Sequence, residues 1–388
     1  MSVKNIIVYS QTLPPAHVGG IETNAYYLIQ HLFQRSEFKI TVVTRTKRKL
    51  LLRGALNLAY GDTAFKAHLL KKSQIQKSGG VTAFFRKLGV KPEETVIYHN
   101  SLDLYKYFGE LANEGFLQVA RSGGNDLSFL QKNAGDRAAF CAAFAHLNTL
   151  FVNSNYSREK AEEIGIEPGI LRVVKGGCDV TGQKPASKSA LGIAEDKPVI
   201  LICGRLVDFK GLDDALHAVT QLQQRGLDPL LLLVGEGPLR PSLQALAQQL
   251  GIESNCRFVG KVAPDEVAKY YQCADVYLSS SKDVSRMVDG FRYVHTETMG
   301  RSICEAQACG LPVVVTAAGG SAEMLVDRQT GIVIPQDNPA AMTDALEELL
   351  KDDELREKMG TAALAYAEEA LGWEAVLSRY VEVMSALA

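Results

Sequence analysis

The sequence lacks several features that would assign a protein to a class at once. No run approaches the roughly 18 apolar residues that a transmembrane helix needs, so we expect no membrane-spanning helix. The first ten residues hold only a short apolar run with no small-residue cleavage site after it, so we expect no secretory signal peptide. Cys-x-x-Cys is absent, and the seven cysteines lie mostly within apolar segments. These absences favour a cytoplasmic protein with reduced thiols.

Two kinds of binding site are also missing from the sequence. The seven histidines and seven cysteines show no spacing typical of a metal site, so no metal is expected. The fingerprint Gly-x-Gly-x-x-Gly does not occur, which argues against a dinucleotide-dependent oxidoreductase.

The charge balance is even overall but uneven along the chain. Lys and Arg number 42 and Asp and Glu number 44, a net charge of -2, so nucleic acid is not an expected partner. Residues 39–91, however, hold 13 bases and one acid, Asp62, which leaves the remaining residues with 29 bases and 43 acids. This stretch is either a solvated basic face or a contact for an anionic acceptor or the inner face of an anionic membrane.

The 388 residues suit two domains, and short apolar runs alternate with helical patterns along both halves. Such runs predict strands buried on both faces, as in a parallel sheet. In the first half the predicted strands are 4–9, 39–44, 95–98, 116–120 and 149–152. In the second half they are 198–203, 229–234, 256–259, 276–278, 312–315 and 331–334. The pattern predicts an α/β protein with two doubly wound domains, joined at the polar segment 175–194.

Gly-rich loops follow several of these strands, at the edge where open α/β sheets bind ligands. Gly19 and Gly20 stand between the first strand and the first helix, where free N–H groups favour a phosphate. The segment 204–211 carries Arg205 and Lys210, which could clamp a diphosphate or could be solvated loop cations. Gly235, in Gly-Glu-Gly-Pro, also follows a strand, where it could lie against a ligand or could only shape a plain turn. The backbone of Lys261 and Val262, after the strand 256–259, is expected to be accessible to a flat ring such as a nucleotide base.

The segment 297–314 is the most specific. Glu297 is expected in a loop, Gly300 at a helix N-terminus, and Glu305 within the first turns of that helix. Two carboxylates there could accept hydrogen bonds from sugar hydroxyls, while the backbone of Gly300–Ser302 could hold a phosphate. The alternative is a surface helix whose start is stabilised by its dipole. Met299 and Arg301 belong to the same segment.

Taken together, these motifs resemble those of the retaining GT-B fold glycosyltransferases of family 4, also described as glycosyl transferases group 1. The resemblance covers 195–350 strongly and residues before 180 weakly. It implies two Rossmann-like domains facing a cleft, with an acceptor-binding domain at 1–180 and a nucleotide-sugar domain at 190–365. It also implies that the last helix, 366–388, crosses back onto the first domain. No cofactor or metal is implied, since cations and helix termini neutralise the diphosphate.

The resemblance also assigns roles to single residues. Arg205 and Lys210 would contact the donor diphosphate, Glu305 the ribose hydroxyls and Glu297 the donor sugar. Gly19 and Gly20 would approach the diphosphate from the other domain, while Gly235 and the backbone of Lys261 and Val262 would lie near the nucleotide. Met299, Gly300, Arg301 and Ser302 complete the expected donor site.

Two departures from the family pattern leave roles open. Where many relatives have a histidine, this chain reads Gly123-Gly-Asn-Asp126. Asp126 could orient the acceptor or could cap the following helix, which we favour. His99, at the end of the preceding strand, could replace the missing histidine or be structural. The loop 279–295 is also unusually long and could shape the sugar pocket.

The function implied is transfer of a sugar from a nucleoside diphosphate to a hydroxyl of a glycan, lipid-linked or small-molecule acceptor. Retention is expected, with a UDP-sugar favoured over GDP-mannose and with cell-surface glycan or lipopolysaccharide synthesis as the setting. One alternative is a non-catalytic nucleotide-sugar binding protein, which the missing histidine motivates. Another is a sugar-nucleotide epimerase of the same architecture, which would need no acceptor.

Overall fold

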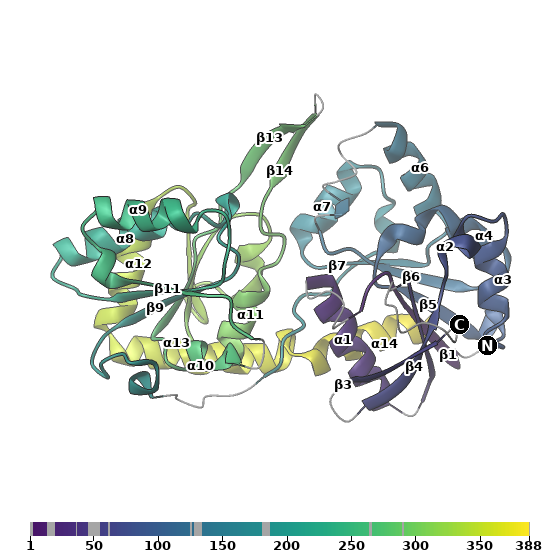
Figure 1. Cartoon of the computed structure of the whole chain (residues 1–388), viewed down its shortest axis with the longest axis horizontal. Coiled ribbons are helices and arrows are strands. Elements are labelled where there is room, and N and C mark those ends of the chain that lie inside the picture. The colour runs from purple at the N-terminus through teal and green to yellow at the C-terminus, as the bar shows by residue number, and fades with distance from the viewer. Residues whose placement is uncertain are drawn as a thin grey trace. The chain divides into compact units, whose positions relative to one another are not determined.

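The computed structural model describes residues 3–13, 20–35, 37–45, 55–60, 63–124, 126–127, 134–180, 187–263, 266–288 and 291–387. The chain divides into two compact α/β units (Figure 1). The first comprises Met1–Val174, Val288–Tyr293 and Val376–Ala388, and the second comprises Lys175–Met287 and Val294–Ala375. The change of unit after Val174 lies at the start of the polar segment 175–194.

The first unit is built on an eight-stranded sheet in the order β3-β4-β2-β1-β5-β6-β7-β8. All neighbours pair in parallel except β3, which is antiparallel to β4. The strands are β1 (Asn5–Ser10), β2 (Lys39–Thr44), β3 (Ala55–Tyr60), β4 (Thr63–Leu69), β5 (Thr95–His99), β6 (Leu117–Arg121), β7 (Thr149–Val152) and β8 (Leu171–Val173). Strand β5 is buried throughout, as expected for a central strand covered on both faces.

The helices of the first unit close two apolar cores, one around Ile7 and Phe85 and one around Phe108 and Leu150. These helices are α1 (Gly20–Phe33), α2 (Lys72–Ile75), α3 (Gly80–Arg86), α4 (Phe108–Asn113), α6 (Ala134–Phe144) and α7 (Asn155–Glu163). Helix α14 (Trp373–Ser385) begins in the second unit and continues in the first.

The second unit carries a six-stranded parallel sheet in the order β11-β10-β9-β12-β15-β16. The strands are β9 (Val199–Cys203), β10 (Leu230–Val234), β11 (Cys256–Gly260), β12 (Val276–Ser279), β15 (Val313–Thr316) and β16 (Gly331–Ile334). Helices α8 (Leu212–Gln224), α9 (Arg240–Gln249) and α12 (Pro339–Lys351) cover one face. On the other face lie α10 (Ala268–Gln272) and α11 (Arg301–Ala308), and α13 (Asp353–Tyr366) also packs on this unit.

Both units therefore have the parallel, doubly wound α/β architecture that the sequence predicts, but five strands were not predicted. The strands β3 and β4 are rich in Ala and short of β-branched residues, which weakens a propensity-based prediction. Strand β8 has only three residues. The segment expected as a long loop contains β13 (Val284–Val288) and β14 (Phe291–His295), which pair only with each other (Figure 1).

Candidate functional site

The site lies at the carboxyl ends of the second unit's strands. The sheet reverses its direction of growth between β9 and β12, and loops that follow two such strands leave an open crevice in doubly wound sheets. Lys210 follows β9, and Glu297 follows β12 beyond the β13–β14 hairpin. The topology thus brings together two motifs that are 87 residues apart.

Glycines allow the loops after β9, β10 and β11 to touch through their backbones. The N–H of Gly204 donates to the carbonyl of Val234 at 2.9 Å, and the N–H of Gly235 donates to the carbonyl of Gly260 at 2.9 Å. A Cβ on Gly235 would lie 1.8 Å from the Gly204 oxygen, and the φ of Gly235 is 139°. Any other residue at 235 would push these loops apart.

Lys210 and Glu297 form the central ion pair of the site. Their side chains are 16% and 19% exposed, so water screens the pair less than a surface pair. Lys210 is the last residue of a short 3-10 turn, Asp208–Lys210. The turn ends at Gly211, which has a φ of 56°. The Ser280 hydroxyl, which donates to the Lys210 carbonyl at 2.8 Å, fixes this turn from the end of β12. Arg205, in the same loop, is exposed to solvent.

The loop that carries Glu297 is held by its backbone. The carbonyl of Glu297 accepts a hydrogen bond from the N–H of Gly320 at 2.9 Å. A Cβ on the neighbouring Gly319 would lie 2.2 Å from that same carbonyl. Because its backbone is anchored in this way, Glu297 presents its carboxylate to Lys210 from a fixed position.

Helix α11 begins beside this pair. Its N-cap is Gly300, with a φ of 86°, and its first residues are Arg301 and Ser302. The carboxylate of Glu305 accepts hydrogen bonds from the Arg301 guanidinium at 2.8 Å and from the Tyr271 hydroxyl at 3.0 Å. Free N–H groups at a helix N-terminus attract anions, and the carboxylates of Glu297 and Glu305 can accept hydrogen bonds from hydroxyls.

Two buried tyrosines support the helix start, although no sequence pattern indicates this role. Tyr271 on α10 and Tyr277 on β12 read as apolar core residues, and they are 2% and 1% exposed. The Tyr277 hydroxyl donates to the Ser302 hydroxyl at 2.7 Å. Burial and nearby negative charge raise the pKa of both phenols well above their usual value of 10, so both keep their protons.

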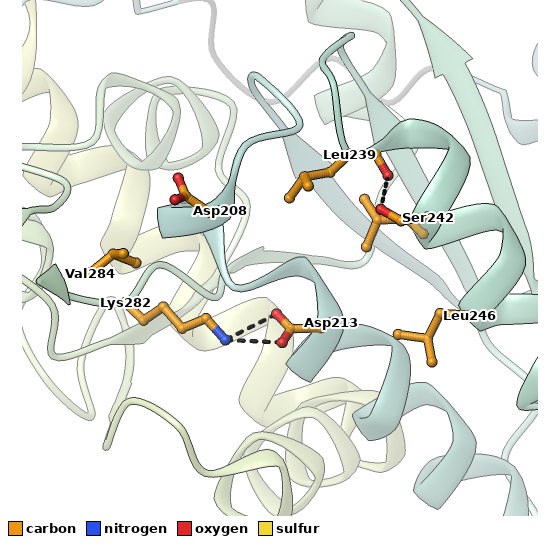
Figure 2. Close-up of a pocket in the computed structure, with 8 residues that line it drawn as sticks. Asp208, Asp213, Leu239, Ser242, Leu246, Lys282 and Val284 are labelled. Carbon is orange, nitrogen blue, oxygen red and sulfur yellow. Dashed lines mark hydrogen bonds and ion pairs between the residues drawn. The ribbon is translucent and has the colours of Figure 1, made fainter. Parts of the chain in front are cut away.

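Pockets flank the loop that carries Lys210. A small pocket of about 10 Å³ is lined by Cys203–Arg205, Lys210, Tyr277 and Ser279–Ser281 among others. A larger one of about 340 Å³ is lined by Asp208, Asp213, Leu239, Ser242, Leu243, Leu246, Lys282 and Val284 (Figure 2). There the Lys282 ammonium contacts both oxygens of Asp213, at 3.1 and 3.0 Å, so the polar end of the larger pocket is internally neutralised.

The remaining residues of the expected donor site are placed as follows. Lys261 and Val262 directly follow β11, next to the Gly235–Gly260 contact. The side chain of Met299 is 5% exposed and belongs to the core, so only its backbone could face a ligand. Gly20 is the first residue of α1, whereas Gly19 lies outside the described residues.

Both acceptor-side candidates are engaged by structural contacts. His99 is fully buried, with Nε2 3.2 Å from the amide oxygen of Gln118. Burial lowers the pKa of His99 to about 3, so the ring is neutral. Asp126 accepts from the Ser122 hydroxyl at 2.6 Å, from the Gly123 N–H at 3.2 Å and from the Leu127 N–H at 3.0 Å. These contacts favour the structural interpretation of each residue.

Within the described ranges, no group of three or more His, Cys, Asp or Glu residues is arranged to hold a metal ion. No helix there combines the length and apolar character that a bilayer crossing requires.

Residues 183–365 match the family described as glycosyl transferases group 1. The match covers most of the second unit. The matched region contains the Lys210–Glu297 pair and helix α11, so the group 1 motifs and the site coincide.

Curated relatives match the group 1 region but share only part of their length with this chain. A GDP-mannose-dependent alpha-(1-6)-phosphatidylinositol monomannoside mannosyltransferase from Mycolicibacterium smegmatis is 32% identical over 190 residues, 49% of this chain and 48% of that protein. A D-inositol 3-phosphate glycosyltransferase from Corynebacterium aurimucosum is 30% identical over 246 residues, 59% of this chain and 55% of that protein. The chain thus spans about half the length of the curated relatives it matches.

Solved structures show the fold across the whole chain. Anabaena HepE, in complex with UDP and glucose, superposes with a TM-score of 0.73 at 18% identity, covering 99% of this chain and 100% of that one. The sucrose-phosphate synthase of Thermosynechococcus elongatus superposes with a TM-score of 0.74 at 18% identity, covering 99% of both chains. The GT-B fold class that the resemblance implies is confirmed.

Proposed function

We propose that this protein is a glycosyltransferase that moves a sugar from a nucleoside-diphosphate sugar to a hydroxyl acceptor. The observation that carries the proposal is the convergence of Lys210, Glu297 and the N-terminus of α11 at the switch point of the group 1 unit. A cation and free N–H groups suit a diphosphate, and carboxylates suit ribose and sugar hydroxyls. HepE, a structural neighbour, has been solved with UDP and glucose.

In the proposed reaction the bond between the anomeric carbon and the β-phosphate oxygen breaks, and its electron pair stays on the phosphate. Lys210, Arg205 and the start of α11 stabilise this charge, in the manner of an oxyanion hole. The acceptor oxygen bonds to the anomeric carbon on the same face, and its proton passes to the departing phosphate. Retention follows, with no enzymic nucleophile and no bound metal in the proposal.

Donor binding also changes the Lys210–Glu297 pair in this proposal. The Lys210 ammonium is neutralised by Glu297. An incoming diphosphate takes over the ammonium, which leaves the Glu297 carboxylate available to the hydroxyls of the donor sugar. We propose UDP-sugars as the preferred donors, with GDP-mannose as the competing choice in a donor panel.

The test is nucleotide release from a panel of UDP- and GDP-sugars with a broad set of hydroxyl acceptors. We expect Lys210→Ala and Glu305→Ala to lower the rate at least about 100-fold, because each removes a charged contact to the donor. The matched control is Lys197→Ala. Lys197 pairs with Asp228 before β9, at the opposite edge of the sheet, and should retain activity. Unchanged activity in Lys210→Ala would refute the proposal.

For the acceptor side we propose contact with an anionic membrane surface through the basic stretch 39–91. Its described part includes Lys72, Lys77 and Lys87, all exposed on or beside the short helices α2 and α3. Replacing these three lysines with Ser should weaken sedimentation with phosphatidylglycerol vesicles at low salt, with less effect at high salt. Equal sedimentation of the variant and the unmodified protein would exclude this contact.

A further inference from the structure

Glu305 is the carboxylate expected to bind ribose, and it already has a donor on each oxygen. One oxygen accepts from the Tyr271 hydroxyl at 3.0 Å and the other from the Arg301 guanidinium at 2.8 Å. Tyr271 is 2% exposed, whereas the Glu305 side chain is 27% exposed. The carboxylate is therefore held from the protein interior by a phenol while part of it still reaches solvent.

The lone pairs of Glu305 determine what it can still bind. A carboxylate offers about four acceptor positions, two on each oxygen. Tyr271 and Arg301 use one position on each oxygen. One position therefore remains on each, and two neighbouring hydroxyls can donate to them side by side. A ribose has such a pair of hydroxyls, and a 2′-deoxyribose does not.

Tyr271 is suited to fix this arrangement. Burial and the adjacent carboxylate raise the pKa of its hydroxyl well above 10, so it donates to Glu305 and does not ionise. Its ring packs near that of Tyr277, with centroids 5.9 Å apart, inside the core that α11 covers. Arg301 alone is a weaker support, because its side chain is 32% exposed and can exchange Glu305 for water.

We propose that Tyr271 is a positioning residue that holds Glu305 ready for both ribose hydroxyls and so makes the site prefer ribonucleoside over 2′-deoxyribonucleoside diphosphates. The inference rests on the proposed function, since it takes a nucleotide as the ligand. Tyr271 does not itself touch the nucleotide in this proposal, but it sets the selectivity of the site.

The experiment compares the binding of UDP and 2′-deoxy-UDP, and of GDP and 2′-deoxy-GDP, by calorimetry on the full chain. We expect the unmodified protein to prefer the ribonucleotide. In Tyr271→Phe the preference should fall roughly fivefold to tenfold, because one hydrogen bond that orients a charged group is lost. The KM for the nucleotide sugar should rise while kcat changes by less than about twofold, since Tyr271 acts on donor binding.

The matched control is Tyr277→Phe. It removes a hydroxyl of equal burial from the same core, but that hydroxyl bonds to Ser302 and not to Glu305. Tyr277→Phe should change the affinity for the ribonucleotide and for the 2′-deoxyribonucleotide equally, so the preference between them should stay unchanged. A second variant, Glu305→Asp, keeps the tyrosine and withdraws the carboxylate by one methylene, and it should also lose the preference.

The outcomes separate this inference from the function on which it rests. If the unmodified protein binds neither UDP nor GDP, both the function and the inference are wrong. If it binds and discriminates, but Tyr271→Phe or Glu305→Asp keeps the full preference, only the inference is overturned. The inference is supported if Tyr271→Phe and Glu305→Asp lose the preference for the ribonucleotide while the unmodified protein and Tyr277→Phe keep it. Tryptophan fluorescence of Trp373, the single tryptophan, checks that each variant is folded.

Discussion

At the scale of single residues, the site depends on charges whose partners come from distant parts of the chain. Lys210 is neutralised by Glu297, and Glu305 is paired with Arg301 and accepts a hydrogen bond from Tyr271. An internally paired site keeps its side chains in place before the ligand arrives, which reduces the entropy that binding must overcome. In the proposed function the donor diphosphate replaces Glu297 as the partner of an ammonium that is already held in place, so it does not have to order a free side chain.

His99 allows a prediction about pH. Burial lowers its pKa from 6.5 to about 3, so between these values the unfolded chain binds a proton that the folded chain does not. The free energy of unfolding therefore falls as the pH decreases from 6.5 toward 3, by up to about 5 kcal/mol from this group. His99→Gln, which can still donate to Gln118, should flatten that fall.

The measurement is urea unfolding of both proteins at intervals between pH 7 and pH 4. Other groups contribute equally to both, so the difference between the two curves isolates His99. Curves that stay parallel over the whole range would show that His99 is protonated in the folded protein, and its acceptor-side role would have to be reconsidered.

At the scale of elements, the turns after the parallel strands decide where the functional side chains stand. The loops after β9, β10 and β11 meet through the backbones of Gly204, Gly235 and Gly260. The β13–β14 hairpin, inserted before the Glu297 loop, adds a further tie, since Arg286 on β13 pairs with Asp208 of the Lys210 turn. The loops are thus positioned by one another as well as by their strands.

We predict that Gly235→Ala destabilises the second unit and weakens nucleotide binding. Its Cβ would lie 1.8 Å from the Gly204 oxygen, so the Arg205 loop must move. Gly226→Ala is the matched control, because Gly226 also has a positive φ, 83°, but a Cβ there meets nothing within 4 Å. Urea unfolding should place Gly235→Ala about 1–3 kcal/mol below the control. Equal stability and equal UDP affinity in the two variants would contradict this assignment.

At the scale of the whole molecule, the chain builds its first unit from segments that are far apart in sequence. The last part of α14 completes it, because Tyr380 packs its ring against Phe151 at 4.6 Å and Tyr98 at 5.7 Å. The Arg121 side chain donates to the Tyr380 hydroxyl at 3.2 Å. Folding of the first unit thus requires the C-terminal residues, so it depends on contacts of very long sequence separation.

We predict that Tyr380→Ala destabilises the first unit by about 3–5 kcal/mol, as expected when a large buried aromatic side chain is removed. Trp373 lies in the second unit and is 3% exposed, so its fluorescence reports on that unit. UDP at 100 times its dissociation constant should still stabilise the Trp373 transition by about 2.7 kcal/mol in this variant.

Circular dichroism and tryptophan fluorescence during urea unfolding provide the measurement. Circular dichroism reports on both units, and the fluorescence of Trp373 reports on the second unit alone. If Tyr380→Ala shifts both signals equally and removes the stabilisation by UDP, the two units unfold as one cooperative body and the prediction is wrong.

The sequence alone determined the α/β architecture of this protein and most of its parallel strands. Buried parallel strands read as continuous apolar runs, so β9 and β10 were predicted within one residue, and the Gly-rich loops after them marked the ligand-binding edge. The sequence did not decide whether His99 and Asp126 have acceptor-side or structural roles, because burial and hydrogen bonding cannot be read from residue type.

Only the tertiary structure decided which side chains act on one another. Lys210 meets Glu297 because β9 and β12 are neighbours in the sheet, a relation that strand patterns do not encode. Tyr271 reads like any core residue, and only its position beneath α11 turns it into a hydrogen-bond donor to Glu305. Local sequence fixes conformation over a few residues, whereas the pairing of distant charges depends on how the whole sheet is assembled.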